Sequence, residues 1–178
     1  MIPREMATTS EVRTIDLGRA AGPIVQAPRW RRLDLGVRPY RPVLTLQERL
    51  VERAIADATA RPALILVEHS PAVITMGRRS APDHVLATPE ALRLGGTEVI
   101  EVTRGGDVTW HGPGQLVAYP IVRLTSLGLT LRQYVERLEQ AVIDVLADVG
   151  LSGQLDPRHP GVWVSGRKVA AVGVAVRR

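Results

Sequence analysis

The segment from Arg104 to Gln115, "RGGDVTWHGPGQ", combines backbone freedom with side chains that can do chemistry. It holds four glycines in twelve residues, and glycine lets a backbone approach a ligand closely and adopt positive φ angles. Unpaired backbone N–H groups in such a loop can bind an oxyanion or a phosphate. Arg104 can donate hydrogen bonds to a carbonyl, and His111 can act as a donor, as a general base or as a residue that orients the loop. The segment therefore predicts a binding or catalytic loop, with two successive turns that merely join strands as the alternative.

The motifs that this segment lacks narrow the chemistry. It matches neither the GxxxxGK[ST] phosphate loop nor the GxGxxG dinucleotide loop. No second metal ligand stands at a usable spacing from His111, so we expect no metal site. His69 in "VEHSPAV" is expected to be a structural histidine at a loop where a strand ends, and His84 is isolated in the sequence. Lys168 follows a turn, where a lone lysine is usually solvated.

Alternating apolar residues predict the strands that would position this segment. The strands are expected in the stretches "WRRLDLGV", "ALILVE", "AVITMG", "TEVIEV" and "QLVAYPIV", with a final hairpin formed by "GVWV" and "RKVAAVGVAV" around Ser165 and Gly166.

Three helices are expected between these strands. The first lies in "RPVLTLQERLVERAIADATARP", with a capping box from Thr45 to Glu48, an apolar face that ends at Ala58, and Pro62 as its stop. A short helix begins with Thr88 as its cap and Pro89 as its first residue. The clearest helix ends at Gly150 and carries one apolar stripe, formed by Leu131, Val135, Leu138, Val142, Val145 and Val149. Helices and strands do not alternate strictly, so we expect an α+β fold with a mainly antiparallel or mixed sheet flanked by helices.

The composition fits one globular domain. The chain has 178 residues, 45% of them hydrophobic and 23% charged, enough for a buried core. We expect residues 1–29 to be a flexible extension and residues 30–178 to form the domain. The net charge of +5 suits an acidic protein partner or simply an arginine-rich chain, and no cluster of aromatic and basic residues indicates nucleic-acid binding. Cysteine is absent, which excludes disulfides and cysteine metal sites within these residues.

No segment of the sequence has the length and apolarity of a signal peptide or a membrane span. The apolar run "ALILV" is far shorter than a bilayer crossing needs. We therefore expect a cytoplasmic protein without a membrane partner.

Three blocks of sequence resemble the octanoyltransferase family, also known as lipoyl(octanoyl) transferases or lipoate-protein ligase B. "LVEHSPAVITMGR" (Leu66–Arg78) is similar to the family's "EHPP…TLGR" segment, and "RGGDVTWHGPGQLVAYP" resembles its glycine-rich segment. "HPGVWVSGRKVAAVGVAV" (His159–Val176) is similar to its "PGVWV…KIAAIGV" segment. The resemblance runs from about Trp30 to Arg178, and it implies the biotin/lipoate protein ligase fold.

The resemblance also implies an activity and its partners. Members of this family transfer an octanoyl group from octanoyl-acyl carrier protein to a lysine on lipoyl domains of 2-oxoacid dehydrogenases and on the glycine cleavage H protein. The reaction passes through a cysteine thioester and needs no cofactor. Lys168 matches the catalytic lysine, which lowers the pKa of that cysteine. The substrate-binding positions implied by the match are Arg104, Gly105, Gly106, Asp107, Val108, Thr109, Trp110, His111, Ala171, Val172 and Gly173.

This sequence departs from the family in one respect. The family's nucleophilic cysteine follows the "KVAAVGV" strand, and the 178 residues contain no cysteine. We therefore expect the chain to be a piece of a longer transferase and to be inactive as written. Two alternatives remain open: a natural short form that binds acyl groups or partners without turnover, and an ATP-dependent lipoate-protein ligase in which Lys168 holds a carboxylate or phosphate. "TWHGPGQ" favours the transferase over the ligase.

Overall fold

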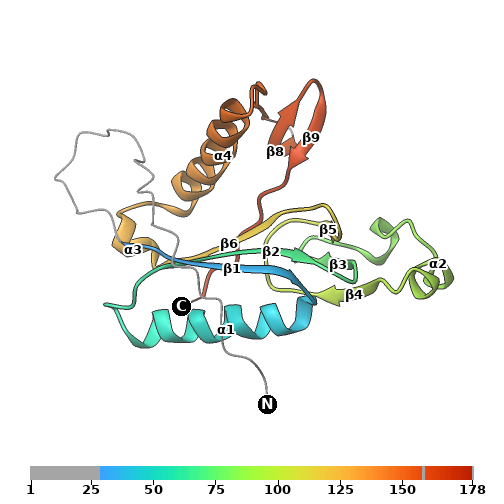
Figure 1. Cartoon of the computed structure of the whole chain (residues 1–178), viewed down its shortest axis with the longest axis horizontal. Coiled ribbons are helices and arrows are strands. Elements are labelled where there is room, and N and C mark those ends of the chain that lie inside the picture. Colours follow the sequence, from blue (N-terminus) through green and yellow to red (C-terminus); the bar gives the residue numbers. More distant parts are fainter. Residues whose placement is uncertain (1–28, 158, 178) are drawn as a thin grey trace, which may run out of the picture.

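The computed structural model describes residues 29–157 and 159–177 (Figure 1). The extension expected at residues 1–29 lies, apart from Arg29, outside the described residues. The described chain forms three sheets of three strands each, with α1 and α4 as its long helices. This arrangement confirms the predicted α+β class with mixed sheets flanked by helices.

The first sheet forms the floor of the main core. Its strand order is β1-β2-β6, with β1 parallel and β6 antiparallel to the central β2. The bounds are Arg31–Arg38 for β1, Ala63–His69 for β2 and Val117–Ile121 for β6. Alternate residues of β2 are buried, because successive side chains of a strand point to opposite faces. Helix α1 (Tyr40–Ala56) runs along one face of this sheet, as Figure 1 shows, and packs Val43 against Ile65, Val67 and Val117.

Both predicted ends of α1 were wrong. The helix begins at Tyr40 with Pro39 as its cap, so Thr45 lies inside it and donates a hydrogen bond to the Arg41 carbonyl oxygen instead of capping. Proline is tolerated in the first turn of a helix because the N–H that it lacks would be unpaired there. At the other end α1 stops at Ala56, before Ala58 and Pro62. The cause is Asp57, which is extended and whose carboxylate accepts hydrogen bonds from the Thr59 N–H and hydroxyl, an arrangement that competes with the helix.

The second sheet carries the glycine-rich segment. Its strand order is β4-β3-β5, with bounds Glu98–Glu101 for β4, Val73–Met76 for β3 and Val108–His111 for β5. Strand β5 lies inside the segment, so the alternative of two successive turns was wrong: the segment is a loop, a strand and then a turn. Helix α2 (Pro89–Leu94), which precedes β4, begins as predicted, because the Thr88 hydroxyl accepts a hydrogen bond from the Ala91 N–H. A single 3-10 turn, η1 (Pro82–His84), connects β3 to this region.

The third sheet and α4 form the C-terminal part of the described chain. The elements are α3 (Leu124–Leu127), α4 (Leu131–Asp148), β7 (Gln154–Asp156), β8 (His159–Val164) and β9 (Arg167–Ala170). Figure 1 shows the β8–β9 hairpin beside α4, set apart from the other two sheets. Ser165 and Gly166 both have positive φ, the conformation that a tight two-residue hairpin turn requires. The hairpin confirms the prediction in type, but β9 ends at Ala170 and the chain then leaves the sheet.

The apolar stripe predicted for α4 is only partly buried. Val145 and Val149 are 64% and 67% exposed. The helix instead buries Tyr134 and Glu139, and the Glu139 carboxylate accepts a hydrogen bond from the Gly161 N–H in β8. A buried carboxylate paired with a backbone donor therefore fixes the contact between α4 and the hairpin. Thr130 and Gln133 form a capping box at the start of α4.

None of the helices in the described part of the chain is long and apolar enough to cross a bilayer.

Candidate functional site

The glycine-rich loop is fastened to the end of β3 by backbone hydrogen bonds. Three consecutive N–H groups, from Gly77 to Arg79, donate to carbonyl oxygens of residues 104–107 at 3.0–3.2 Å. A Cβ atom on Gly77 would lie 2.5 Å from the Gly106 carbonyl oxygen and 2.7 Å from an Arg104 guanidinium nitrogen. Only glycine at this position lets the two loops come so close.

Arg104 is the cation of this site. Its side chain is half-buried, and its Nη2 atom donates to both the carbonyl oxygen and the hydroxyl of Thr75 at 2.8 Å. Burial lowers the pKa of Arg104, but a guanidinium stays protonated at neutral pH. No carboxylate of residues 29–157 or 159–177 forms an ion pair with it, because the nearby Asp107 pairs with His84 at 2.7 Å instead. Arg104 thus holds a positive charge that a substrate carbonyl or anion can use.

Four aromatic and imidazole rings pack together, and we call them the ring cluster: Tyr40, His69, His111 and Tyr119. Their ring centroids lie 5.1–6.4 Å apart in the four recorded pairs. They come from α1, β2, β5 and β6, so the cluster joins the first two sheets. Such distances are those of packed aromatic pairs, and the cluster therefore gives the site a rigid wall.

His69 is fully buried in this cluster. It was predicted to be structural, which the hydrogen bonds bear out, but it is the last residue of β2 and not a loop residue. Its Nδ1 lies 3.1 Å from the Arg38 carbonyl oxygen and its Nε2 lies 2.9 Å from the Tyr119 hydroxyl. A carbonyl only accepts, so Nδ1–H donates to it and Nε2 accepts from the hydroxyl. Burial lowers the pKa of His69, which keeps the ring neutral at pH 7.

His111 and Arg104 both lie next to the Thr75 hydroxyl. The His111 Nδ1 lies 2.7 Å from Oε1 of Gln115, and its Nε2 lies 3.5 Å from the Thr75 hydroxyl. Burial lowers the pKa of His111, and the positive charge of Arg104 and the neighbouring His69 ring lower it further, although the Gln115 hydrogen bond opposes them. His111 is therefore neutral at pH 7 and can accept a proton or a hydrogen bond.

Asp107 and His84 form an exposed pair at the rim of the loop. The hydrogen bond between them raises the pKa of His84 and lowers the pKa of Asp107. Because His84 lies in η1, the pair ties η1 to the glycine-rich loop. His84, which the sequence could not place, thus has a site-shaping position.

The structure brings together some of the predicted substrate-binding residues. Gly173 lies against Arg104 and Gly105, since a Cβ there would be 3.3 Å from both the Arg104 Cδ atom and the Gly105 carbonyl oxygen. Ala171 and Val172 precede it in the segment after β9, and the Val174 carbonyl oxygen accepts a hydrogen bond from the Gly105 N–H at 2.8 Å. Val108 and Thr109 are half-buried on β5, whereas Trp110 is 47% exposed. The loop and the segment after β9 therefore form one surface.

The four glycines of the segment lie in two separate pairs, on either side of β5. The Gly105 N–H is already paired with Val174. Gly112 and Gly114 lie beyond the far end of β5 from Gly105 and Gly106, roughly 13 Å along a strand of four residues. Gly112 accommodates the Trp110 ring, which a Cβ would meet at 2.3 Å.

Lys168 lies in the hairpin and not against the loop. Its side chain is exposed, and its Nζ atom lies 5.3 Å from the centre of the Trp163 ring, a distance typical of a cation–π contact. The five backbone steps from Lys168 to Gly173 span at most roughly 18 Å. Lys168 is also the one lysine among 23 basic residues of the sequence; this is a sequence signal that would have singled it out without any family resemblance.

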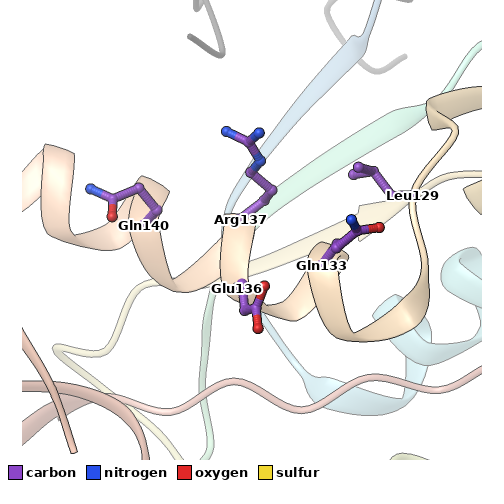
Figure 2. Close-up of a pocket in the computed structure, with 5 residues that line it drawn as sticks. All are labelled: Leu129, Gln133, Glu136, Arg137 and Gln140. Carbon is purple, nitrogen blue, oxygen red and sulfur yellow. The ribbon is translucent and has the colours of Figure 1, made fainter. Parts of the chain in front are cut away.

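The hollow on α4 does not suit an acyl chain. Figure 2 shows the hollow on α4, lined by Leu129, Gln133, Glu136, Arg137 and Gln140. Its lining is mainly polar, and Glu136 already pairs with Arg132. Among the described residues, no group of three or more histidines and carboxylates could hold a metal ion.

Sequence reasoning missed Tyr40, Thr75, Gln115 and Tyr119. Each contacts a predicted residue from a distant part of the chain or from the turn after β5. For Thr75 the sequence did hold a signal, because it is a polar residue in an otherwise apolar strand. A buried hydroxyl requires a hydrogen-bond partner, so such a residue indicates a polar contact nearby.

We expect Tyr119→Phe to destabilise the protein by about 1–3 kcal/mol, because it removes the donor to the buried His69 Nε2 and leaves that acceptor unpaired. Urea unfolding measures the change. Tyr134→Phe is a matched control: the Tyr134 hydroxyl is buried, has no hydrogen-bond partner among the described residues, and burial raises its pKa to about 12. Removing it should cost nothing. Equal losses from both substitutions would contradict the pairing of His69 with Tyr119.

The sequence of the chain is similar to those of known proteins. Residues 39–178 match the family model of the lipoyl protein ligase A/B catalytic domain. The chain is 47% identical over 146 residues to an octanoyltransferase of Syntrophobacter fumaroxidans, covering 82% of this chain and 63% of that protein. It is 46% identical over 143 residues to an octanoyltransferase of Xylella fastidiosa, covering 80% and 58%. The chain thus spans about three fifths of the length of these curated relatives.

Solved structures share the fold. A lipoate-protein ligase A bound with ATP superposes with a TM-score of 0.65 at 16% identity, covering 83% of this chain and 62% of that one. A lipoate protein ligase described as putative, from T. acidophilum, superposes with a TM-score of 0.57 at 17% identity, covering 84% and 63%. These likenesses confirm the predicted ligase-like fold and concern the fold alone.

Proposed function

The chain belongs to the lipoyl protein ligase A/B catalytic domain family, and from that premise we propose that the whole protein is an octanoyltransferase of protein lipoylation. It transfers an octanoyl group from octanoyl-acyl carrier protein to a lysine of lipoyl domains, those of 2-oxoacid dehydrogenases and the glycine cleavage H protein. Two curated relatives at 46% and 47% identity carry the name octanoyltransferase. The observation that carries the proposal is the half-buried Arg104 guanidinium, which lies beside the glycines and has no carboxylate partner among the residues that the structure describes.

Arg104 and the glycines bind the acyl group in this proposal. Gly105, Gly106 and Gly173 lie where the loop, Arg104 and the segment after β9 pack closely together, and the octanoyl chain lies against this surface. The Arg104 guanidinium donates to the thioester carbonyl oxygen, whose negative charge grows when a nucleophile attacks. The rest of the segment, from Asp107 to His111, and the pair Ala171 and Val172 complete the binding surface.

Lys168 assists both steps of the proposed reaction. A cysteine thiolate attacks the octanoyl thioester carbonyl, a new thioester forms on the enzyme, and the carrier protein leaves as its thiol. The lipoyl-domain amine then attacks this thioester, an amide forms and the cysteine thiolate leaves. The Lys168 ammonium favours the cysteine thiolate by its charge and gives a proton to the leaving carrier thiolate. The neutral Lys168 amine then accepts the proton that the lipoyl-domain amine loses. The cysteine is not among these 178 residues, and we propose that it lies in chain outside them.

The experiment is a transfer assay with the whole protein, octanoyl-acyl carrier protein and an apo lipoyl domain, without ATP. We expect an octanoylated lipoyl domain, detected by its mass. A lipoyl domain that is modified only when ATP and free octanoate are supplied would overturn the proposal and favour a ligase. Binding of the carrier protein without any modification would overturn it and favour a non-catalytic acyl- or partner-binding protein.

A further inference from the structure

Gln115 connects the His111 ring to the strand backbone. The Gln115 Nε2 atom donates to the Trp110 carbonyl oxygen at 3.1 Å. This contact fixes the orientation of the amide, because a carbonyl can pair only with the NH₂ end. Oε1 therefore faces His111 Nδ1 at 2.7 Å. An amide oxygen accepts but cannot donate, so His111 Nδ1 carries the proton.

The other nitrogen of His111 then has a free lone pair. His111 Nε2 lies 3.5 Å from the hydroxyl of the buried Thr75. The same hydroxyl accepts a hydrogen bond from Arg104 Nη2 at 2.8 Å. The hydroxyl proton is thus free to point to His111 Nε2 or to the Thr109 carbonyl oxygen, 3.4 Å away. When the hydroxyl proton points to His111 Nε2, the hydrogen bonds form a chain with a single direction. Each group donates to the next one, in the order Arg104, Thr75, His111, Gln115 and the Trp110 carbonyl oxygen.

We infer that Gln115 is a positioning residue that holds His111 as the Nδ1–H tautomer and, through Thr75, holds the Arg104 guanidinium at the acyl site. The tautomer follows from the hydrogen bonds alone; the kinetic consequence rests on the proposed function. A hydrogen-bond chain with one direction lets each member stabilise the next. Loss of Gln115 frees His111 to change tautomer, and an Nε2–H would then face the Thr75 hydroxyl as a second donor beside Arg104.

The groups that face His111 leave no charge to support its protonated form. Arg104 is a cation whose charge repels a protonated His111, and His69 is neutral because burial lowers its pKa. Tyr40, whose ring stacks on His111 at 6.4 Å, is kept neutral because burial raises its pKa. Protonation would also turn Nε2 into a donor and break the chain at Thr75. The site is therefore built for neutral His111, and transfer should fall as the pH drops through the pKa of this histidine.

The tautomer is tested by nitrogen NMR of the whole protein labelled in its histidines. We expect His111 to be neutral and protonated on Nδ1 at pH 7, and we expect Gln115→Leu to shift it to the Nε2–H form or to a mixture. A wild-type ring protonated on Nε2, or a tautomer that Gln115→Leu leaves unchanged, would overturn the inference. The spectrum also reports whether each variant is folded.

The kinetic consequence is tested with octanoyl transfer as the readout. Gln115→Leu should lower kcat/KM about tenfold, the effect of one lost hydrogen bond at a site. Gln140→Leu, at an exposed position of α4, should leave kcat/KM unchanged. Gln115→Glu keeps the acceptor but adds a negative charge, so the pKa of His111 should rise by roughly one unit. Neutral His111 then exists only at higher pH, and the acid limb of the kcat/KM profile should move up by the same amount.

Two outcomes separate this inference from the function. If the acid limb stays in place while the NMR titration of His111 moves in Gln115→Glu, the link between His111 and transfer is wrong. If the unsubstituted protein transfers no octanoyl group at all, the proposed function is wrong, and the tautomer assignment is still decided by the spectrum.

Discussion

Lys168→Ala in the whole protein is expected to slow octanoyl-thioester formation by roughly 10²–10⁴-fold, the range for a positioned proton-transfer group. The thiol loses the cation that favours its thiolate, so less thiolate is present to attack the octanoyl thioester. The later transfer to the lipoyl domain should also slow, because the acceptor amine loses its base. The rate of thioester formation should recover in part at high pH, where the thiol ionises without help. Quench-flow with octanoyl-acyl carrier protein measures the first step alone.

Lys168→Arg separates the two roles. Arginine restores the positive charge but cannot accept a proton at accessible pH. We therefore expect thioester formation to return in large part and transfer to the lipoyl domain to stay slow. Arg167→Ala, one position earlier on the same exposed strand, is the control and should leave both steps unchanged. A near-normal rate for Lys168→Ala would show that Lys168 is a solvated lysine that lies over Trp163 and has no catalytic role.

Gly77→Ala is expected to damage both stability and transfer. The new methyl group would lie 2.5 Å from the Gly106 carbonyl oxygen and 2.7 Å from Arg104 Nη1. Rigid backbone on one side and a hydrogen-bonded guanidinium on the other cannot both give way, so the loops must separate. We expect a loss of about 1–3 kcal/mol in the free energy of unfolding, the usual cost of overpacking, and a large fall in transfer because Arg104 is displaced from Thr75.

Gly105→Ala provides the matched control in the same loop. Its Cβ would meet only the Val174 carbonyl oxygen at 3.6 Å, an ordinary contact. Stability should therefore be nearly unchanged, while a methyl group on the proposed acyl surface should raise KM. Urea unfolding and steady-state transfer are measured on both variants. Wild-type stability for Gly77→Ala would contradict the close approach of the two loops.

Elements with local signals were predictable from the sequence. Thr88 and Pro89 mark the start of α2, and the Ser165–Gly166 turn marks the hairpin, because caps and tight turns depend on neighbouring residues. The ends of α1 were not, since a proline-rich first turn and an Asp57 side chain overrode the capping pattern. The buried face of α4 also differs from the predicted apolar stripe, because Glu139 is buried where its carboxylate accepts a hydrogen bond from the hairpin.

The site was predictable only as a segment. The glycines, Arg104 and His111 stand out locally, but what they touch depends on sheet pairing between residues far apart in the chain. Thr75 meets Arg104 through the pairing of β3 with β5, and Tyr119 meets His69 through that of β2 with β6. Register of this kind cannot be read from one sequence.

The most direct test of the proposed function is the intact mass of the protein, isolated from its natural source and incubated with octanoyl-acyl carrier protein without an acceptor. We predict a mass increase of one octanoyl group that hydroxylamine removes, on a cysteine-containing peptide outside residues 1–178. An unmodified protein, or an adduct that resists hydroxylamine, would contradict transfer through a cysteine thioester.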